Sequence, residues 1–328
     1  MNRRTSSAIR RISQWLPNTA LVLALTLNAP AQPATDGRIL SSQRHKPLPP
    51  FDSLDDFGRN YFPRDLYERA REQADFEILD LQYASGGLSV PGLLVRPKNP
   101  GSRKWPAIIY NRGGTGDDGR IDHITIVEMY LLARAGFVII ASDYRFHGST
   151  SKQDEWGGKD VDDVLNLVPA VRSLEFVDPE RLFMVGVSRG GTMTYLALKR
   201  GAPVRAAAVI AGPSDLEALG RSRPEFVNGF DTYDGWAKVW PDYAHRAAAY
   251  YRERSAIYWA DKLMVPILIL QSRQDRRVPV DQSLRMAAAL QAAGRKYALH
   301  IYSDDGHSLP ANRTDRNRQI IEWFLKAP

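Results

Sequence analysis

The feature that most constrains the fold is a short apolar run that ends in a glycine-rich turn and continues directly as a helix-forming segment. The run, residues 182–187, has the length and composition of a buried strand. The turn is Gly186-Val-Ser188-Arg-Gly190-Gly191, and residues 192–199 favour a helix. Glycine on both sides of the serine lets strand and helix approach closely while the serine adopts a strained backbone. The sequence predicts a sharp strand–turn–helix unit with Ser188 exposed at its tip.

The G-x-S-x-G pattern by itself has two interpretations. With Gly and Ser each at about 7% of residues, it arises by chance in roughly one chain of this length in ten. The first interpretation is a glycine-rich turn whose serine only caps the helix. The second is a reactive serine, because N–H groups at a helix N-terminus stabilise developing negative charge. The rest of the chain favours the second.

Strand-like and helix-like segments alternate along most of the chain. This alternation predicts an α/β fold with a mostly parallel central sheet flanked by helices. Ser85-Gly86-Gly87 marks an antiparallel hairpin that leads into that sheet. The expected strands are 76–83, 88–96, 105–110, 137–142, 182–187, 206–211, 265–271 and 297–302. The expected helices are 52–73 (interrupted at Pro63), 125–135, 159–174, 192–199 and 318–325.

The first 31 residues have the anatomy of a secretory signal peptide. A basic start with four arginines precedes the apolar stretch 20–27, and Ala29-Pro-Ala31 offers small residues for cleavage. The stretch is short for a bilayer span, so we expect export to the periplasm or medium and no membrane anchor after cleavage. Cleavage would lower the formal charge from +7 to +3, which argues against a nucleic-acid partner. Residues 32–51 are expected to form a flexible leader, and residues 52–328 a single domain.

An insertion at about 217–260 is expected to form a helical cap. It is unusually rich in aromatic residues, which either form the private core of the cap or line a substrate pocket. The ten aromatic residues are Phe226, Phe230, Tyr233, Trp236, Trp240, Tyr243, Tyr250, Tyr251, Tyr258 and Trp259.

A reactive serine needs a histidine base and a carboxylate that orients it, and in this type of fold they follow the serine in the order acid, then histidine. Asp275 lies in the loop after strand 265–270, and His307 lies in the loop after strand 297–302. His307 is the one histidine in a loop after both Ser188 and Asp275. The competing acids are Asp281, Asp304 and Asp305, and the competing histidines are His45, His123, His147, His245 and His300.

An oxyanion hole needs two donors aimed at the developing negative charge. The backbone N–H of Arg189, directly after the serine, is one candidate. The other is expected in the loop Asn111-Arg112-Gly113-Gly114, as the Gly113 N–H or a group of Arg112. The alternative is a plain glycine turn. The chain contains no cysteine and no H-E-x-x-H spacing, so we expect neither a metal nor a cofactor.

These motifs together resemble the catalytic domain of the prolyl oligopeptidase family, within the α/β-hydrolases, over residues 75–328. The resemblance rests on four stretches: Gly186–Gly191, Asp143-Tyr-Arg-Phe-His-Gly-Ser149, Asp275-Arg-Arg-Val-Pro279 and Asp305-Gly-His307. It implies Ser188 as nucleophile, His307 as general acid–base and Asp275 as the orienting acid. Many members have glycine where Ser272 stands. Family peptidases usually carry a preceding β-propeller, and the residues before position 75 are too few for one.

The expected function is therefore that of an exported serine hydrolase that cleaves a peptide or amide bond through an acyl-enzyme. A carboxylesterase acting on small acyl or acetyl esters is the alternative, because relatives without a propeller are often esterases. A non-catalytic binding protein on a hydrolase scaffold is the remaining alternative. The expected partner is a peptide or small-molecule substrate, and the sequence leaves the oligomeric state open.

Overall fold

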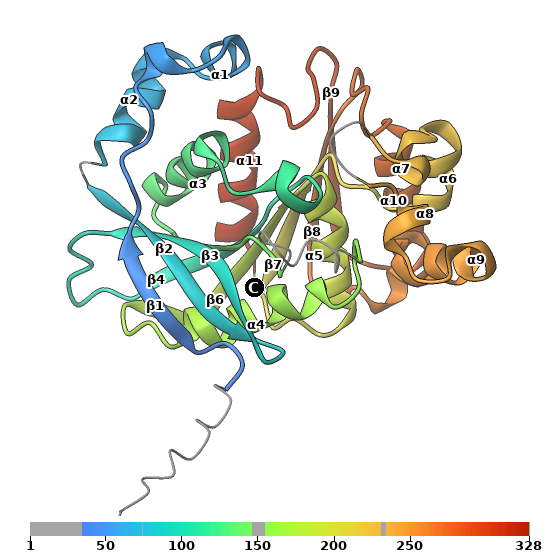
Figure 1. Cartoon of the computed structure of the whole chain (residues 1–328), viewed down its shortest axis with the longest axis horizontal. Helices are drawn as coiled ribbons and strands as arrows, with labels where there is room; N and C mark the ends of the chain where they lie inside the picture. Colours follow the sequence, from blue (N-terminus) through green and yellow to red (C-terminus); the bar gives the residue numbers. More distant parts are fainter. Residues whose placement is uncertain (1–34, 74, 146–154, 231–233, 328) are drawn as a thin grey trace, which may run out of the picture. The chain divides into compact units, whose positions relative to one another are not determined.

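The computed structural model describes residues 35–73, 75–145, 155–230 and 234–327. Within these ranges the centre of the fold is a nine-stranded sheet with the order β1-β2-β3-β5-β4-β6-β7-β8-β9 (Figure 1). Strands β5, β4, β6, β7, β8 and β9 are mutually parallel. On the other side of β5, each successive pair is antiparallel: β5 with β3, β3 with β2 and β2 with β1. The predicted α/β-hydrolase architecture is confirmed. The strands are β1 (Ile39–Arg44), β2 (Phe76–Ser85), β3 (Leu88–Pro97), β4 (Trp105–Asn111), β5 (Val138–Ser142), β6 (Val177–Val187), β7 (Ala206–Ile210), β8 (Ile267–Ser272) and β9 (Tyr297–Tyr302).

Helices cover both faces of the sheet and bury two separate apolar cores. In β6, Leu182 and Met184 belong to one core, and Phe183 and Val185 belong to the other. This alternation follows from the two-residue period of a strand. Helices α4 (Asp160–Arg172), α5 (Arg189–Lys199) and α10 (Asp281–Ala292) pack on the first face, and α2 (Arg64–Glu72), α3 (His123–Arg134) and α11 (Arg313–Leu325) on the second.

The N-terminal part differs from the sequence-based expectation in one respect. The leader expected to be flexible contains strand β1, which pairs with β2 at the edge of the sheet. Most of its side chains are exposed, so the sequence carries no apolar period, and backbone hydrogen bonds hold the strand. The predicted break at Pro63 is present, between α1 (Asp56–Tyr61) and α2. The predicted signal peptide, residues 1–31, lies outside the described residues.

The insertion after β7 folds as short helices around an aromatic cluster. Trp236 and Trp240 stack with ring centroids 5.1 Å apart, and Tyr250 and Tyr251 pack against Trp240. Tyr233 falls outside the described residues. The described aromatic residues of the insertion do not line the pocket that contains Ser188, which favours the private-core interpretation. Its helices are α6 (Leu216–Ser222), α7 (Glu225–Asn228), α8 (Trp236–Val239), α9 (Tyr243–Arg254) and the 3-10 segment Ala256–Lys262.

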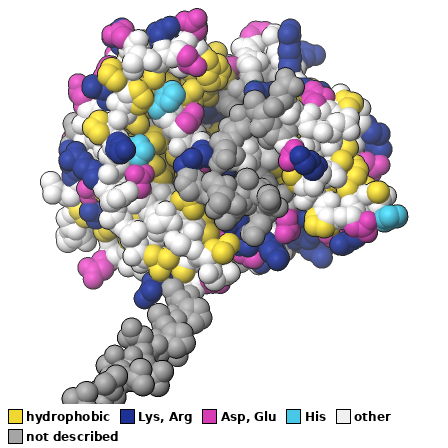
Figure 2. All heavy atoms as spheres, viewed as in Figure 1, with side chains coloured by type: hydrophobic (Ala, Val, Ile, Leu, Met, Phe, Trp, Pro, Cys, Tyr) yellow, Lys and Arg dark blue, Asp and Glu magenta, His cyan; other side chains and the backbone are white. Residues whose placement is uncertain are grey.

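One face of the molecule shows how its charged side chains are distributed. On the face shown in Figure 2, basic and acidic side chains are interspersed and form no stripe of one sign. A nucleic-acid groove would place basic side chains together along one face. Among the helices of the described ranges, none has both the length and the apolar character needed to cross a bilayer.

Candidate active site

Ser188 occupies a strained turn between β6 and α5. Its backbone has φ 56° and ψ −127°, a conformation that L-residues rarely adopt. A side chain at Gly190 would place a Cβ 1.9 Å from the carbonyl oxygen of Asn111, and one at Gly186 would place it 2.2 Å from the Gly190 carbonyl. Only glycine permits these approaches. The predicted strand–turn–helix unit is therefore present, with its serine at the carboxyl end of the parallel strands.

His307 and Asp275 meet at the same end of the sheet. The Asp275 Oδ2 atom lies 2.7 Å from His307 Nδ1 and accepts a hydrogen bond from Gln271 Nε2 at 3.1 Å. The Asp275 Oδ1 atom accepts the backbone N–H groups of Arg277 and Val278 at 2.8 and 2.9 Å. These contacts fix both oxygens of the carboxylate, so the imidazole has one defined orientation.

The environment of Asp275 favours its charged form. Burial by itself raises the pKa of this carboxyl group. The hydrogen bond and charge of His307 and the two backbone N–H groups outweigh burial, and the pKa lies below its ordinary value of 3.8. Asp275 is thus an anion at neutral pH and can stabilise a positive charge on His307.

The competing acids form other contacts. Asp305 accepts the backbone N–H groups of Gly306, Ala311 and Asn312 and so shapes the loop that carries His307. The other two contact surface side chains: Asp304 accepts from Gln274 Nε2, and Asp281 pairs with Arg285. Asp275 is the acid that contacts His307.

The competing histidines are likewise placed elsewhere. His45 and His245 contact Asp80 and Asp242, and His300 lies in β9. His123 begins α3 and is absent from the lining of the Ser188 pocket, within the described chain. His147 lies outside the described residues, as do residues 146–149 of the Asp143–Ser149 stretch.

One cavity of about 470 Å³ contains both Ser188 and His307. Gly113, Tyr110 and Val187 also line it. The Ser188 hydroxyl forms no hydrogen bond with His307 in the described structure, and such bonds commonly tighten only when substrate binds. The cavity brings Ser188 and His307 together around a space large enough for part of a peptide, and Asp275 contacts His307 without lining that space.

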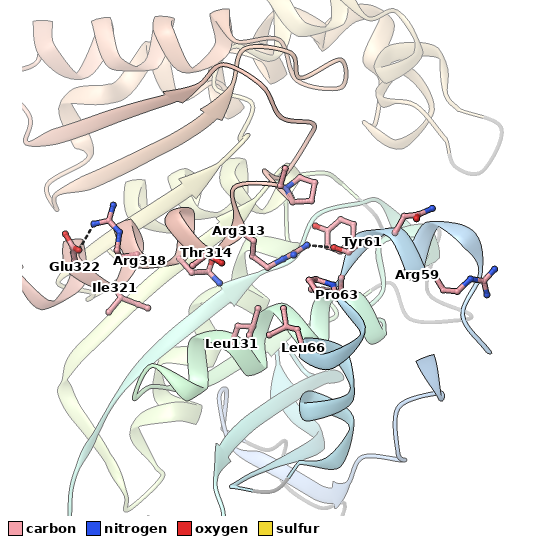
Figure 3. A pocket seen from close by; sticks show the side chains of 15 residues that line it. Arg59, Tyr61, Pro63, Leu66, Leu131, Arg313, Thr314, Arg318, Ile321 and Glu322 are labelled. Atoms are coloured by element: carbon pink, nitrogen blue, oxygen red, sulfur yellow. Dashed lines mark hydrogen bonds and ion pairs between the residues drawn. The ribbon is translucent and has the colours of Figure 1, made fainter. Parts of the chain in front are cut away.

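A larger cavity of about 880 Å³ lies beside this one, between α1, α2, α3 and α11 (Figure 3). The two cavities share Tyr61 and Pro310 in their linings. Within the larger one, Arg313 donates to the Tyr61 carbonyl at 2.6 Å. Neither Ser188 nor His307 lines it, so the smaller cavity is the candidate active site.

The predicted oxyanion loop lies against the serine. A Cβ built on Gly113 would sit 3.2 Å from the Ser188 Cβ and 3.8 Å from its Oγ. Arg112 lines the cavity, but its guanidinium pairs with Asp143, Nε to Oδ1 at 3.2 Å, and donates to backbone carbonyls. The Arg112 guanidinium is therefore engaged by Asp143 and by backbone carbonyls, which disfavours it as the second oxyanion donor. Backbone N–H groups remain the candidates.

Sequence reasoning missed a network of charged side chains on α3 and α11. Two of its members, Glu128 and Arg316, line the cavity. Glu128 on α3 pairs with Arg313 Nε at 2.9 Å and with Arg316, both on α11. Arg316 also donates to the Ser308 carbonyl at 2.6 Å, directly after His307. Ser308 has a left-handed φ of 69°, so this bond holds a strained residue. Glu128 and Arg313 are 185 positions apart, and no local pattern connects them.

A family model and several known proteins each match more than half of this chain. The model of the prolyl oligopeptidase family matches residues 123–327. The uncharacterized peptidase YuxL of Bacillus subtilis is 27% identical over 265 residues, which cover 75% of this chain and 38% of YuxL. The uncharacterized peptidase YtmA of the same organism is 25% identical over 245 residues, covering 74% of this chain and 91% of YtmA.

A solved structure also aligns over most of the chain. The acylaminoacyl peptidase of Pyrococcus horikoshii superposes with a TM-score of 0.64 at 23% identity, and covers 78% of this chain. Only 42% of that longer protein is matched, so the likeness concerns the fold of one part of it. The family match spans well over half of the residues, from α3 through the His307 loop to α11. The chain belongs to the prolyl oligopeptidase family.

Proposed function

We propose that this protein is a serine hydrolase that cleaves peptide or amide bonds through an acyl-enzyme, with Ser188, His307 and Asp275 as its triad. The observation that carries the proposal is the 2.7 Å contact between His307 and Asp275 in a cavity shared with a serine on a strained turn. The histidine base of a triad needs a third group to orient it, and Asp275 supplies this for His307.

The mechanism follows from these contacts. His307 accepts the Ser188 proton on Nε2 while Ser188 Oγ attacks the substrate carbonyl carbon. The Asp275 anion holds the Nδ1 proton and stabilises the imidazolium. The imidazolium then protonates the leaving amine, which leaves an acyl group on Ser188. Water, activated by the neutral His307, attacks the ester and releases the acid.

Two backbone donors would stabilise the tetrahedral oxyanion. The N–H of Arg189 lies at the start of α5, where helix N–H groups favour negative charge. The second donor is an N–H of the loop after β4, where Gly113 approaches Ser188. Donors of this kind contribute about 10²–10³ in kcat each.

Labelling with a fluorophosphonate tests the activated serine. Intact and peptide mass spectrometry of the purified protein is expected to locate one adduct on Ser188. The Ser188→Ala protein should give no adduct. A well-folded wild-type protein that never reacts would favour the non-catalytic binding protein instead.

The choice between amide and ester substrates rests on the family and on the names of the relatives, several of which are peptidases. We expect measurable kcat/KM for a p-nitroanilide and a higher value for the matched p-nitrophenyl ester, because the ester has the better leaving group. Turnover by Ser188→Ala serves as the background. Ester hydrolysis without any amide cleavage would establish the carboxylesterase alternative.

We further propose that the protein is exported and that its first 31 residues are removed. The basic, apolar and small-residue segments of the N-terminus support this. N-terminal sequencing of protein recovered from the periplasm or medium is expected to begin after Ala31. An intact Met1 on the native protein would contradict the proposal.

A further inference from the structure

Three consecutive carbonyl groups in the loop after β4 are each held by a side chain. The Tyr144 hydroxyl donates to the Arg112 carbonyl at 3.2 Å. Arg112 donates to the Gly113 carbonyl at 3.0 Å, and Arg189 donates to the Gly114 carbonyl at 3.1 Å. Two of these donors come from outside the loop, and one of them is the residue after the proposed nucleophile.

The three side chains form one buried cluster. Both guanidinium groups lie over the Tyr144 ring, with Cζ atoms 4.6 Å (Arg112) and 5.2 Å (Arg189) from its centroid. Cations are favourable over an aromatic face, and more so when shielded from water. Tyr144 is fully buried, and Arg112 and Arg189 are only 1% and 2% exposed.

Each arginine has a carboxylate counter-ion that fixes it. Arg112 pairs with Asp143, and Arg189 Nη2 lies 2.6 Å from Asp160 Oδ2. Asp160 is completely buried at the start of α4 and also accepts the backbone N–H of Gly157. A buried charge that loses its partner is strongly destabilised, so loss of Asp160 would loosen the Arg189 guanidinium in this arrangement.

Holding the carbonyl groups also fixes the N–H groups. In a trans peptide the C=O and the following N–H point in opposite directions, and the described residues contain no cis peptide. With the carbonyls of Arg112 and Gly113 turned toward the cluster, the N–H groups of Gly113 and Gly114 turn away from it. Gly113 is the loop residue placed against Ser188.

We propose that Asp160 and the side chain of Arg189 are positioning residues that set the oxyanion-hole donors of this loop. The inference rests on the proposed serine hydrolase function. Arg189 then contributes twice: its backbone N–H is one donor, and its side chain orients the loop that supplies the other. Donors fixed before the reaction need no reorganisation when charge develops on the substrate oxygen.

The test compares Asp160→Asn with a matched variant, Asp163→Asn. Asp163 lies one turn further along α4, is equally buried, and pairs with Arg145 at 2.8 Å rather than with an arginine of the cluster. In Asp160→Asn we expect kcat to fall roughly 10- to 100-fold with little change in KM, because the defect concerns the transition state. The Ki of a trifluoromethyl ketone, which forms a tetrahedral oxyanion on Ser188, should rise by a similar factor. Asp163→Asn should leave kcat and Ki within about twofold of wild type.

Hydrogen–deuterium exchange separates failure of this inference from failure of the proposed function, because it needs no turnover. Amides of residues 111–116 are expected to exchange faster in Asp160→Asn than in wild type or Asp163→Asn. Unchanged exchange and kcat in Asp160→Asn, or equal changes in both variants, would overturn the inference. If Asp160→Asn does not fold, Arg189→Gln decides, since it keeps the backbone N–H of residue 189 and removes the guanidinium that donates to the Gly114 carbonyl. Faster exchange of residues 111–116 in Arg189→Gln supports the proposed positioning role, and wild-type exchange refutes it.

Discussion

Replacing Ser188 with alanine is expected to lower kcat by about 10⁶, close to the loss seen when a nucleophile of a serine hydrolase is removed. The fold should survive, because the Ser188 hydroxyl makes no hydrogen bond in the described structure and alanine tolerates φ 56° no worse than serine does. Steady-state hydrolysis of the p-nitrophenyl ester, with thermal unfolding in parallel, measures both effects.

Ser303→Ala is the matched control. Ser303 is exposed, begins the loop that carries His307, and is not part of the cavity lining. This variant should retain wild-type kcat/KM. Undiminished turnover by Ser188→Ala, with the protein folded, would remove Ser188 from the mechanism and with it the proposed acyl-enzyme.

Asp275→Asn is expected to lower kcat by about 10⁴ at neutral pH. The backbone N–H groups of Arg277 and Val278 would hold the amide oxygen of the introduced asparagine, so its NH₂ group would face His307 Nδ1. A donor at this position forces the imidazole proton onto Nε2, which then cannot accept the Ser188 proton. Single-turnover acylation measured at pH 7 tests this directly.

The pH dependence of stability provides the control for Asp275→Asn. Because the folded-state pKa of Asp275 is lowered, its stabilisation is complete above the unfolded-state pKa near 3.8 and is lost as pH falls through the lower folded-state value. Between pH 5 and pH 3, the free energy of unfolding should decrease more for wild type than for Asp275→Asn, as measured with urea. An equal decrease in the free energy of unfolding for both proteins would show that Asp275 does not stabilise the fold in this way.

The parts of the site that could be predicted from sequence are those encoded locally. Ser188 is flanked by the glycines that its turn requires, and Asp275 and His307 each follow a recognisable strand. The order of the three along the chain then predicts that they meet, because parallel strands end at the same edge.

The parts that could not be predicted depend on contacts between distant residues. The Arg112 side chain is engaged by Asp143, 31 positions later in the sequence. Strand β1 is exposed on most of its length, so only its pairing with β2 defines it. Helix α10 is a different case: it packs against β8 and β9 and is absent from the expected helices, although its Ala-rich residues favour a helix locally.

The burial of β6 on both faces limits which sequence changes this protein can accept during evolution. From Leu182 to Val185, successive residues of the strand divide between opposite cores, and Ser188 follows directly after the strand ends. Insertion or deletion of one residue within the buried half would exchange the cores of every side chain beyond it and shift the serine out of its turn. A conservative substitution there changes only one side chain. The length of β6 is therefore more strongly constrained than the identity of its residues. We expect tolerated insertions and deletions to fall in the surface loops.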